Sequence, residues 1–210
     1  MKSINSIRME EMEDNYKKTV TNDTATLSVR GKSYELPIYG GSTGPEVIDI
    51  STLYRDTNMF TYDPGFTSTA SCESTITYID GDKGELLYRG YPIEQLAEKA
   101  TFIEVSYLLI YGQLPSAEQL NDFRGSITMH TLVHEDMKQF FEAYPAKAHP
   151  MGVLASMVCS LSTFYPESLD PNRSDEYKDI TIHRLLAKLP TLAAWSYKNS
   201  VRHPFMYPKN

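Results

Sequence analysis

The chain has 210 residues, of which 41% are hydrophobic and 22% charged, and its formal net charge is -7. This is ordinary globular composition and argues against a largely disordered chain. The negative charge argues against a nucleic-acid partner, which needs a basic surface. No apolar run reaches the roughly 20 residues that cross a bilayer, so we expect no membrane segment.

The chain has two cysteines, Cys72 and Cys159. They are too few for a disulfide framework and too far apart for a CxxC motif, so a reducing, cytoplasmic setting fits best. Cys72 stands among hydroxyl residues with no base indicated by the sequence, and Cys159 stands in an apolar stretch. We interpret both as structural thiols inside the fold.

The first third of the chain has strand patterns. Residues 1–24 are polar, alternate in charge and lack an apolar stripe, which predicts a flexible tail. From Ala25, "ATLSVRGKSYELPI" alternates apolar and polar residues on both sides of a tight turn at residues 30–32. The Gly-rich "YGGSTGPE" follows, without the Lys-Ser/Thr of a phosphate-binding loop. Residues 25–75 are therefore predicted to form a small β-rich module.

A second pair of strands comes next, because "STITYI" and "GELLYRG" flank a polar turn at residues 80–84. Asp80 and Asp82 resemble the beginning of a calcium loop, but Tyr91 stands at the twelfth position, where a bidentate Glu is required. The segment is therefore interpreted as a hairpin turn. Pro92 stands where a helix would begin, and its missing N–H costs nothing there.

The rest of the sequence has helical spacing with recognisable start and stop signals. Thr101 with Glu104, and Ser116 with Gln119, have the spacing of capping boxes, and Gly112 follows the first of these helices. The second helix is predicted to run toward residue 130. Three further helices are predicted over residues 134–144, 150–165 and 175–201.

Two of these later helices have unusual features. The segment "MGVLASMVCSLSTFY" is apolar on nearly all sides, which predicts a buried helix. Pro190 lies inside the last helix and predicts a kink. The fold class is mainly α: a small β-rich N-terminal module, then a hairpin and part of a large helical domain over residues 76–210.

Two candidate sites can be weighed by spacing. His130 and His134 are four apart, as zinc ligands on a helix are, but no third ligand is indicated and we expect no metal. Arg184 and Lys188 are also four apart and share a helix face, so they could hold phosphates beside His130 or Tyr165. The alternative is favourable charge near a helix end. The residues alone indicate no nucleophile–base pair.

Several longer blocks carry a resemblance to a known family. They are "VIDIS", "FTYDPGFTSTASCESTITYIDGDKGELLYRGYPIEQLAEKA", "VSYLLIYGQLP", "HPMGVL", "RLLAKLPTLAAWSYK" and "HPFMYPKN". In this order they resemble bacterial citrate synthase of the hexameric type, which carries an extra β-rich N-terminal domain. The resemblance covers residues 25–210. It implies a homo-oligomer, dimer or hexamer, that converts oxaloacetate, acetyl-CoA and water to citrate and CoA without a metal.

The resemblance also implies that the catalytic residues lie beyond this chain. In the family they follow the block matched by "FMYPKN", and no histidine of this sequence matches a catalytic one. We therefore assign no catalytic residue and expect residues 1–210 to be inactive alone. Two alternatives are a non-catalytic helical module for oligomerisation or nucleotide sensing, and a 2-methylcitrate synthase that uses propionyl-CoA. The β-rich extension argues against the latter.

Some hexameric members are inhibited by NADH, bound on the large domain. The resemblance places seven residues of this chain where contacts to that nucleotide would lie: His130, Thr131, Tyr165, Arg184, Lys188, His203 and Asn210. Three positions depart from the pattern, because Met129 replaces an Arg, Leu132 replaces a Met and His203 replaces a Gln. Loss of the Arg would weaken a phosphate contact. We expect no resident cofactor, with NADH as a possible allosteric ligand.

Overall fold

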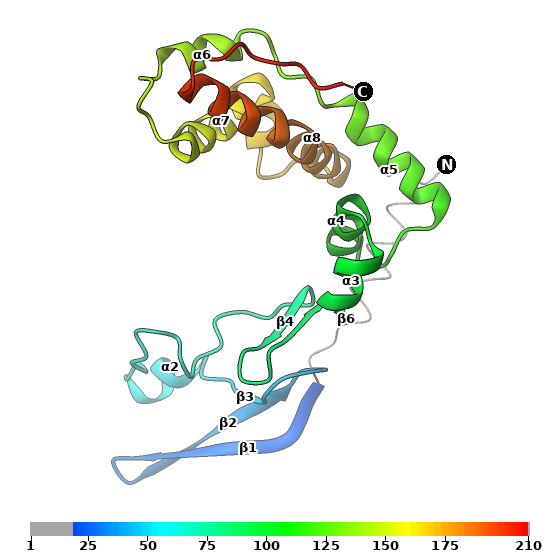
Figure 1. The fold of residues 1–210 in the computed structure, drawn as a ribbon. Helices are drawn as coiled ribbons and strands as arrows, with labels where there is room; N and C mark the ends of the chain where they lie inside the picture. The colour runs from blue at the N-terminus through cyan, green and yellow to red at the C-terminus, as the bar shows by residue number, and fades with distance from the viewer. Residues whose placement is uncertain (1–18, 210) are drawn as a thin grey trace. The chain divides into compact units, whose positions relative to one another are not determined.

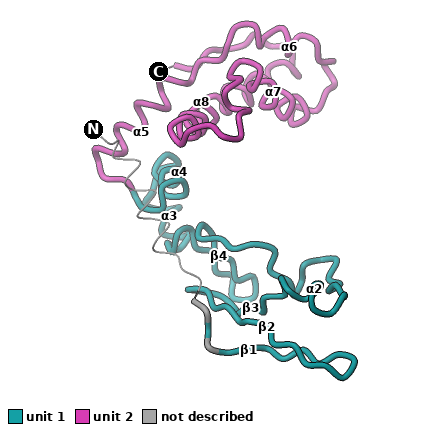
Figure 2. The backbone as a smooth tube through the Cα atoms, turned by 180° about the vertical axis from the view of Figure 1, so that it is seen from behind, with its two compact units in different colours: residues 1–114 teal, residues 115–210 magenta. Residues whose placement is uncertain are grey.

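The structure is a computed structural model that describes residues 19–209 (Figure 1). The chain divides into two compact units, residues 1–114 and 115–210 (Figure 2). Two small antiparallel sheets come first and helices dominate after residue 92, so the mainly α fold class is confirmed. The boundary expected at residue 75 stays a prediction. Most of the expected tail, residues 1–18, lies outside the described residues, and its last part belongs to a strand that begins at Thr19.

The first sheet of unit 1 has the order β1-β2-β3. Its strands are β1 (Thr19–Val29), β2 (Lys32–Gly40) and β3 (Val47–Ile48). Val29 pairs with Lys32, so Arg30 and Gly31 form a two-residue turn, with φ of 52° and 74°. Positive φ at both positions marks a type I′ turn, whose twist matches that of the strands. The tight turn predicted from the sequence is confirmed.

A short helix and an irregular segment follow the sheet. Helix α2 (Leu53–Thr57) ends at Asn58 in the left-handed conformation, and no helix or strand forms again before residue 77. Asp63 organises this segment, because its carboxylate accepts hydrogen bonds from the backbone N–H and hydroxyl of Thr67, the N–H of Ser68 and the hydroxyl of Thr69. These bonds, the Ser68 N–H foremost, lower the pKa of Asp63 to about 2.

The predicted hairpin forms the second sheet. Its strands are β4 (Thr77–Asp80), β5 (Glu85–Tyr88) and β6 (Tyr91–Pro92). The Asp80 carboxylate accepts hydrogen bonds from the N–H and the ammonium of Lys83, so it closes the turn, as the sequence indicated. Arg89 has a φ of 50° and donates to the Thr75 hydroxyl and the Leu109 carbonyl, both at 2.8 Å. It therefore ties the hairpin to the helices that follow.

The two capping boxes form as predicted. In α4 (Phe102–Tyr111), Thr101 and Glu104 bond each other's backbone, and Gly112 ends the helix with a φ of 81°. Ser116 and Gln119 do the same for α5 (Ala117–Met129). The short helix α3 (Ile93–Lys99) begins after Pro92.

Unit 2 contains α5 and a further set of helices around one apolar core. They are α6 (Met137–Ala143), α7 (Pro150–Phe164), the 3₁₀ helix η1 (Pro166–Leu169) and α8 (Asp175–Ser200). The core consists of Val133, Met137, Phe141, Val153, Met157, Leu161, Leu192 and Trp195. Helix α8 continues through Pro190 as one element, and the kink there stays a prediction. Helix α6 begins three residues later than expected.

The chain after α8 returns to this core. Phe205 stacks on Trp195 with ring centroids 5.0 Å apart, and the Trp195 indole N–H donates to the Met206 carbonyl at 2.7 Å. The Tyr207 hydroxyl donates to the Glu135 carboxylate at 2.6 Å and also contacts the Lys138 ammonium. The hydrogen bonds of the Trp195 indole and the Tyr207 hydroxyl, with the stacking of Phe205, thus hold residues 205–207 against the rest of unit 2.

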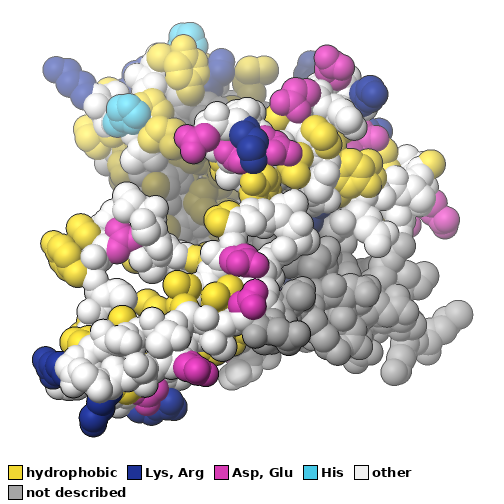
Figure 3. Space-filling view, turned by 90° about the horizontal axis from the view of Figure 1, so that it is seen from below, with side chains coloured by type: hydrophobic (Ala, Val, Ile, Leu, Met, Phe, Trp, Pro, Cys, Tyr) yellow, Lys and Arg dark blue, Asp and Glu magenta, His cyan; other side chains and the backbone are white. Residues whose placement is uncertain are grey.

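Two expectations about buried apolar residues are wrong. Helix α7 buries only the face of Val153, Met157 and Leu161, while Met151 is 63% exposed. Cys72 and Cys159 are both exposed. Burial needs a covering partner as well as an apolar sequence, and in the described part of unit 2 only one side of α7 meets the core. Hydrophobic side chains accordingly stand at the surface in several places (Figure 3).

Candidate functional site

Four of the seven residues expected to contact a nucleotide come together in unit 2. Arg184 and Lys188 project from one face of α8 toward Tyr165, which follows α7. The Arg184 guanidinium carbon lies 4.4 Å from the centroid of the Tyr165 ring, and the Lys188 ammonium lies 5.6 Å from it. Both distances are within the range of cation–π attraction. The shared helix face predicted from the spacing of four is therefore correct.

Lys188 is almost fully buried, with 3% of its surface exposed. Its ammonium donates hydrogen bonds to the carbonyl of His130, at 2.7 Å, and to that of Leu132. Burial, and then the nearby charge of Arg184, lower the pKa of Lys188. The ammonium thus links α8 to the chain that follows α5. Two of the three N–H groups of the ammonium are therefore already used by backbone carbonyls, which leaves fewer donors for a phosphate.

His130 caps the end of α5 beside these cations. Burial lowers its pKa first, and Arg184, Lys188 and His183 lower it further. The lowered pKa favours the neutral form of His130, whose imidazole can donate one hydrogen bond and accept another. The neighbouring Thr131 directs its hydroxyl to the Thr128 carbonyl, at 3.0 Å.

The structure does not bring two of the remaining expected contacts, His203 and Asn210, into this group. His203 is exposed beyond α8, and within residues 19–209 no hydrogen bond, ion pair or ring contact joins its side chain to Tyr165, Arg184 or Lys188. Asn210 lies outside the described residues. Met129 and Leu132, two of the departures from the family pattern, are 82% and 59% exposed. They present apolar side chains next to His130.

A cavity of about 410 Å³ opens beside the Tyr165 ring. Among residues 19–209, Arg184 and Lys188 are its only charged lining residues, and no carboxylate or imidazole lines it. The other lining residues are apolar or carry hydroxyl or thiol groups: Val158, Cys159, Leu161, Ser162, Ser168, Leu169, Thr181 and Leu185. Such a cavity can accept a flat apolar group and place an anionic group at Arg184.

The sequence did not indicate a second contact in this region. Ser126 on α5 and His183 on α8 place the hydroxyl 2.7 Å from Nδ1, and Nε2 lies 3.7 Å from an Asp179 carboxylate oxygen. The ring meets Phe123 edge-on and is only 8% exposed, so substrate has little access to it. We interpret the contact as a tie between two helices. It joins residues 57 apart, which no local pattern reveals.

The zinc-like pair does not sit on a helix. Helix α5 ends at Met129, and residues 131–134 have no helical structure. His134 instead contacts Asp136, at 3.5 Å, and Phe164, with ring centroids 4.8 Å apart. No group of three or more metal-ligating side chains occurs in residues 19–209. Over the same residues, no helix is long and apolar enough to cross a membrane.

The profile of the family described as "Citrate synthase, C-terminal domain" matches residues 65–210. Citrate synthase 1 of Mycobacterium tuberculosis, in strains H37Rv and CDC 1551, is 54% identical over 190 residues, which is 90% of this chain and 44% of the relative. This chain therefore belongs to the citrate synthase family. It spans less than half the length of these curated relatives.

Solved structures show the same fold. Citrate synthase from Thermotoga maritima is 29% identical, with a TM-score of 0.59, over 71% of this chain and 38% of that one. Citrate synthase from Pyrobaculum aerophilum aligns with 92% of this chain and 43% of its own, at 24% identity and a TM-score of 0.59. The second likeness supports the fold alone.

Proposed function

We propose that this chain is the amino-terminal portion of a citrate synthase, which condenses acetyl-CoA with oxaloacetate to give citrate and CoA. The 54% identity over 190 residues with a protein named citrate synthase 1 carries this proposal. Residues 1–210 supply scaffold, and we assign none of them a catalytic role. A cytoplasmic location stays a prediction.

An assay of CoA thiol release tests this function. Residues 1–210, given acetyl-CoA and oxaloacetate, should release no thiol above background, whereas the product of the complete reading frame should turn over. Release by residues 1–210 would disprove the scaffold role. Inactivity of the complete product would disprove the enzyme and favour a non-catalytic module. A clear preference of the complete product for propionyl-CoA would favour the 2-methylcitrate alternative.

The protein is also proposed to be a homo-oligomer, and specifically of the hexameric type. The β-rich module before residue 65 supports that type, because it precedes the part that matches the family profile. The exposed side of α7, with Met151 and Cys159, supports a further interface. Light scattering after size exclusion should give the mass of a hexamer or dimer for the complete product. A monomer at micromolar concentration would contradict both the homo-oligomer and the hexameric type.

NADH is the proposed ligand of the cavity beside Tyr165. Arg184 and Lys188 both approach the Tyr165 ring, and the charge of each lowers the pKa of the nearby His130, which supports an anionic ligand with a flat ring system. Calorimetric titration of NADH into residues 1–210 should show saturable binding that Arg184→Gln weakens about tenfold. Arg124→Gln, an exposed change in α5, is the matched control. Equal affinities for all three proteins would rule the site out.

A further inference from the structure

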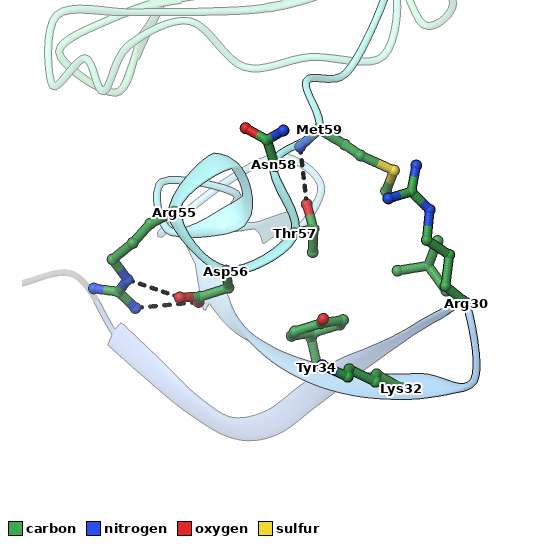
Figure 4. A pocket seen from close by; sticks show the side chains of 9 residues that line it. Arg30, Lys32, Tyr34, Arg55, Asp56, Thr57, Asn58 and Met59 are labelled. Atoms are coloured by element: carbon green, nitrogen blue, oxygen red, sulfur yellow. Dashed lines mark hydrogen bonds and ion pairs between the residues drawn. The ribbon is translucent and has the colours of Figure 1, made fainter.

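A second cavity lies in unit 1, between the β1–β2 turn and α2 (Figure 4). It has a volume of about 300 Å³ and shares no residue with the cavity beside Tyr165. Figure 4 shows side chains from the turn, from β2 and from the end of α2 around the same opening. The charged residues among them are Arg30, Lys32, Arg55 and Asp56.

The single acid of this cavity is already neutralised. Arg55 donates to Asp56 through two nitrogens, at 2.7 and 3.1 Å, and these bonds lower the pKa of the Asp56 carboxyl. Figure 4 shows this pair turned toward itself, away from Arg30. In the described part of the chain, no hydrogen bond or ion pair reaches the side chain of Arg30 or Lys32. Two uncompensated positive charges therefore border the cavity.

Lys32 lies on the inner face of its strand. Alternate residues of a strand share a face, so Lys32, Tyr34 and Leu36 point the same way from β2. Leu36 is 6% exposed, and Tyr34 is half-buried. On this face of β2, Leu36 is buried, and Tyr34 and then Lys32 line the cavity. Lys32 itself is exposed, so its ammonium stands in solvent at the rim of the cavity, where it can meet an anion.

Arg30, the other cation, has an unusual backbone conformation. Arg30 has a φ of 52°, a conformation that costs an L-residue energy and is more common for Asn or Gly in this turn. Asn58, on the opposite side of the cavity, has a φ of 58° and adds a side-chain amide donor. The two left-handed residues belong to different elements, the β1–β2 turn and the end of α2, and both line the cavity.

We propose that this cavity binds a small multivalent oxyanion, held by Arg30 and Lys32 with Asn58 as a neutral donor. The chain as a whole has a net charge of -7, so it repels anions except where local cations concentrate. Two cations of the β1–β2 turn that are unpaired among residues 19–209 and lie at the rim of one cavity suit a ligand with at least two negative groups. The diphosphate of a phosphorylated metabolite and a polycarboxylate both offer this chemistry. The proposal does not depend on the citrate synthase assignment.

Titration of inorganic pyrophosphate into ¹⁵N-labelled residues 1–210 at low ionic strength tests the proposal. Saturable shifts of the backbone amides of Lys32, Tyr34 and Asn58 are expected. Arg30→Gln and Lys32→Gln should each weaken binding about tenfold. Lys99→Gln, an exposed change in α3 of the same unit, should leave it unchanged. A parallel titration with tricarballylate identifies the source: tighter binding of pyrophosphate indicates a phosphorylated ligand, and the reverse indicates a polycarboxylate.

Three results would overturn the proposal. They are the absence of saturation with either anion, shifts spread over both units without a maximum at the cavity, and an equal loss of affinity in Lys99→Gln. The last two indicate general screening of surface charge. Because Arg30 and Lys32 are exposed, far-ultraviolet circular dichroism of their variants should match the parent, so weaker binding cannot be attributed to unfolding.

Discussion

Lys188 has contacts that its position in the sequence does not predict. The distance of four from Arg184 correctly predicts that both side chains share a face of α8. The partners of the ammonium, two carbonyls at residues 130 and 132, are 58 and 56 positions away, so only tertiary structure reveals them. A residue whose spacing allows a phosphate contact therefore also has a structural role.

Replacing Lys188 by Met should destabilise unit 2. The substitution keeps the length of the side chain but leaves two carbonyls without their donor, so we expect a loss of about 2–3 kcal/mol in the free energy of unfolding. Urea titration followed by tryptophan fluorescence measures it. Lys147→Met, at an exposed position of the same unit, should change the value by under about 0.5 kcal/mol. Similar losses in both variants would refute the role of the buried ammonium.

His183 should make stability depend on pH. Burial lowers its pKa below the ordinary 6.5, although Asp179 acts in the opposite direction, and the pKa of His130 is lowered too. Below pH 6.5 the unfolded chain therefore binds more protons than the folded one. The free energy of unfolding should fall as pH decreases from 6.5 through the lowered values.

Variants identify the groups responsible for this pH dependence. His183→Phe should flatten the decrease between pH 7 and pH 5, because the unfolded chain then takes up one proton fewer. His203→Phe, at an exposed position beyond α8, should leave the slope as it is. A parent protein whose stability is constant across this interval would contradict the lowered values.

Helices and strands were predictable where local chemistry decides them. The capping boxes at Thr101 and Ser116, the stop at Gly112 and both tight turns depend on residues within five positions of each other. The exposure of α7 was not predictable, because an apolar sequence does not reveal whether a partner covers it. The group around Tyr165 was predictable only in part. Spacing and the family resemblance named Arg184, Lys188 and His130, but only the structure shows their distances from one another and from the Tyr165 ring.

The segment between α2 and β4 should be the first site of proteolysis. It exposes Phe60, Tyr62 and Phe66 at 79%, 91% and 64%, and hydrogen bonds to Asp63 organise it locally. Asp63→Ala should increase the rate of chymotrypsin cleavage after Phe66 about tenfold. Cleavage after Tyr177, in the first turn of α8, is the internal control and should not change. An equal acceleration at both sites would indicate global destabilisation instead.

At the scale of the whole molecule, long sequence blocks identified the family, while composition and residue patterns alone indicated only a mainly helical globular chain. The family profile begins at residue 65, inside unit 1, whereas the compact units divide after residue 114. The boundary of the family match and the boundary between the compact units therefore differ in this chain. Pattern reading cannot place the second boundary, because it depends on contacts between residues distant in sequence.

Trp195 gives this chain a built-in optical probe. It is the single tryptophan, it lies in unit 2 with 1% of its surface exposed, and Phe205 stacks on it. Its emission should be blue-shifted in the native state and move to the red when the aromatic pair separates. Unit 1 contributes no indole, so the emission maximum follows one unit alone. Release of residues 205–207 should register as a spectral change before the helices melt.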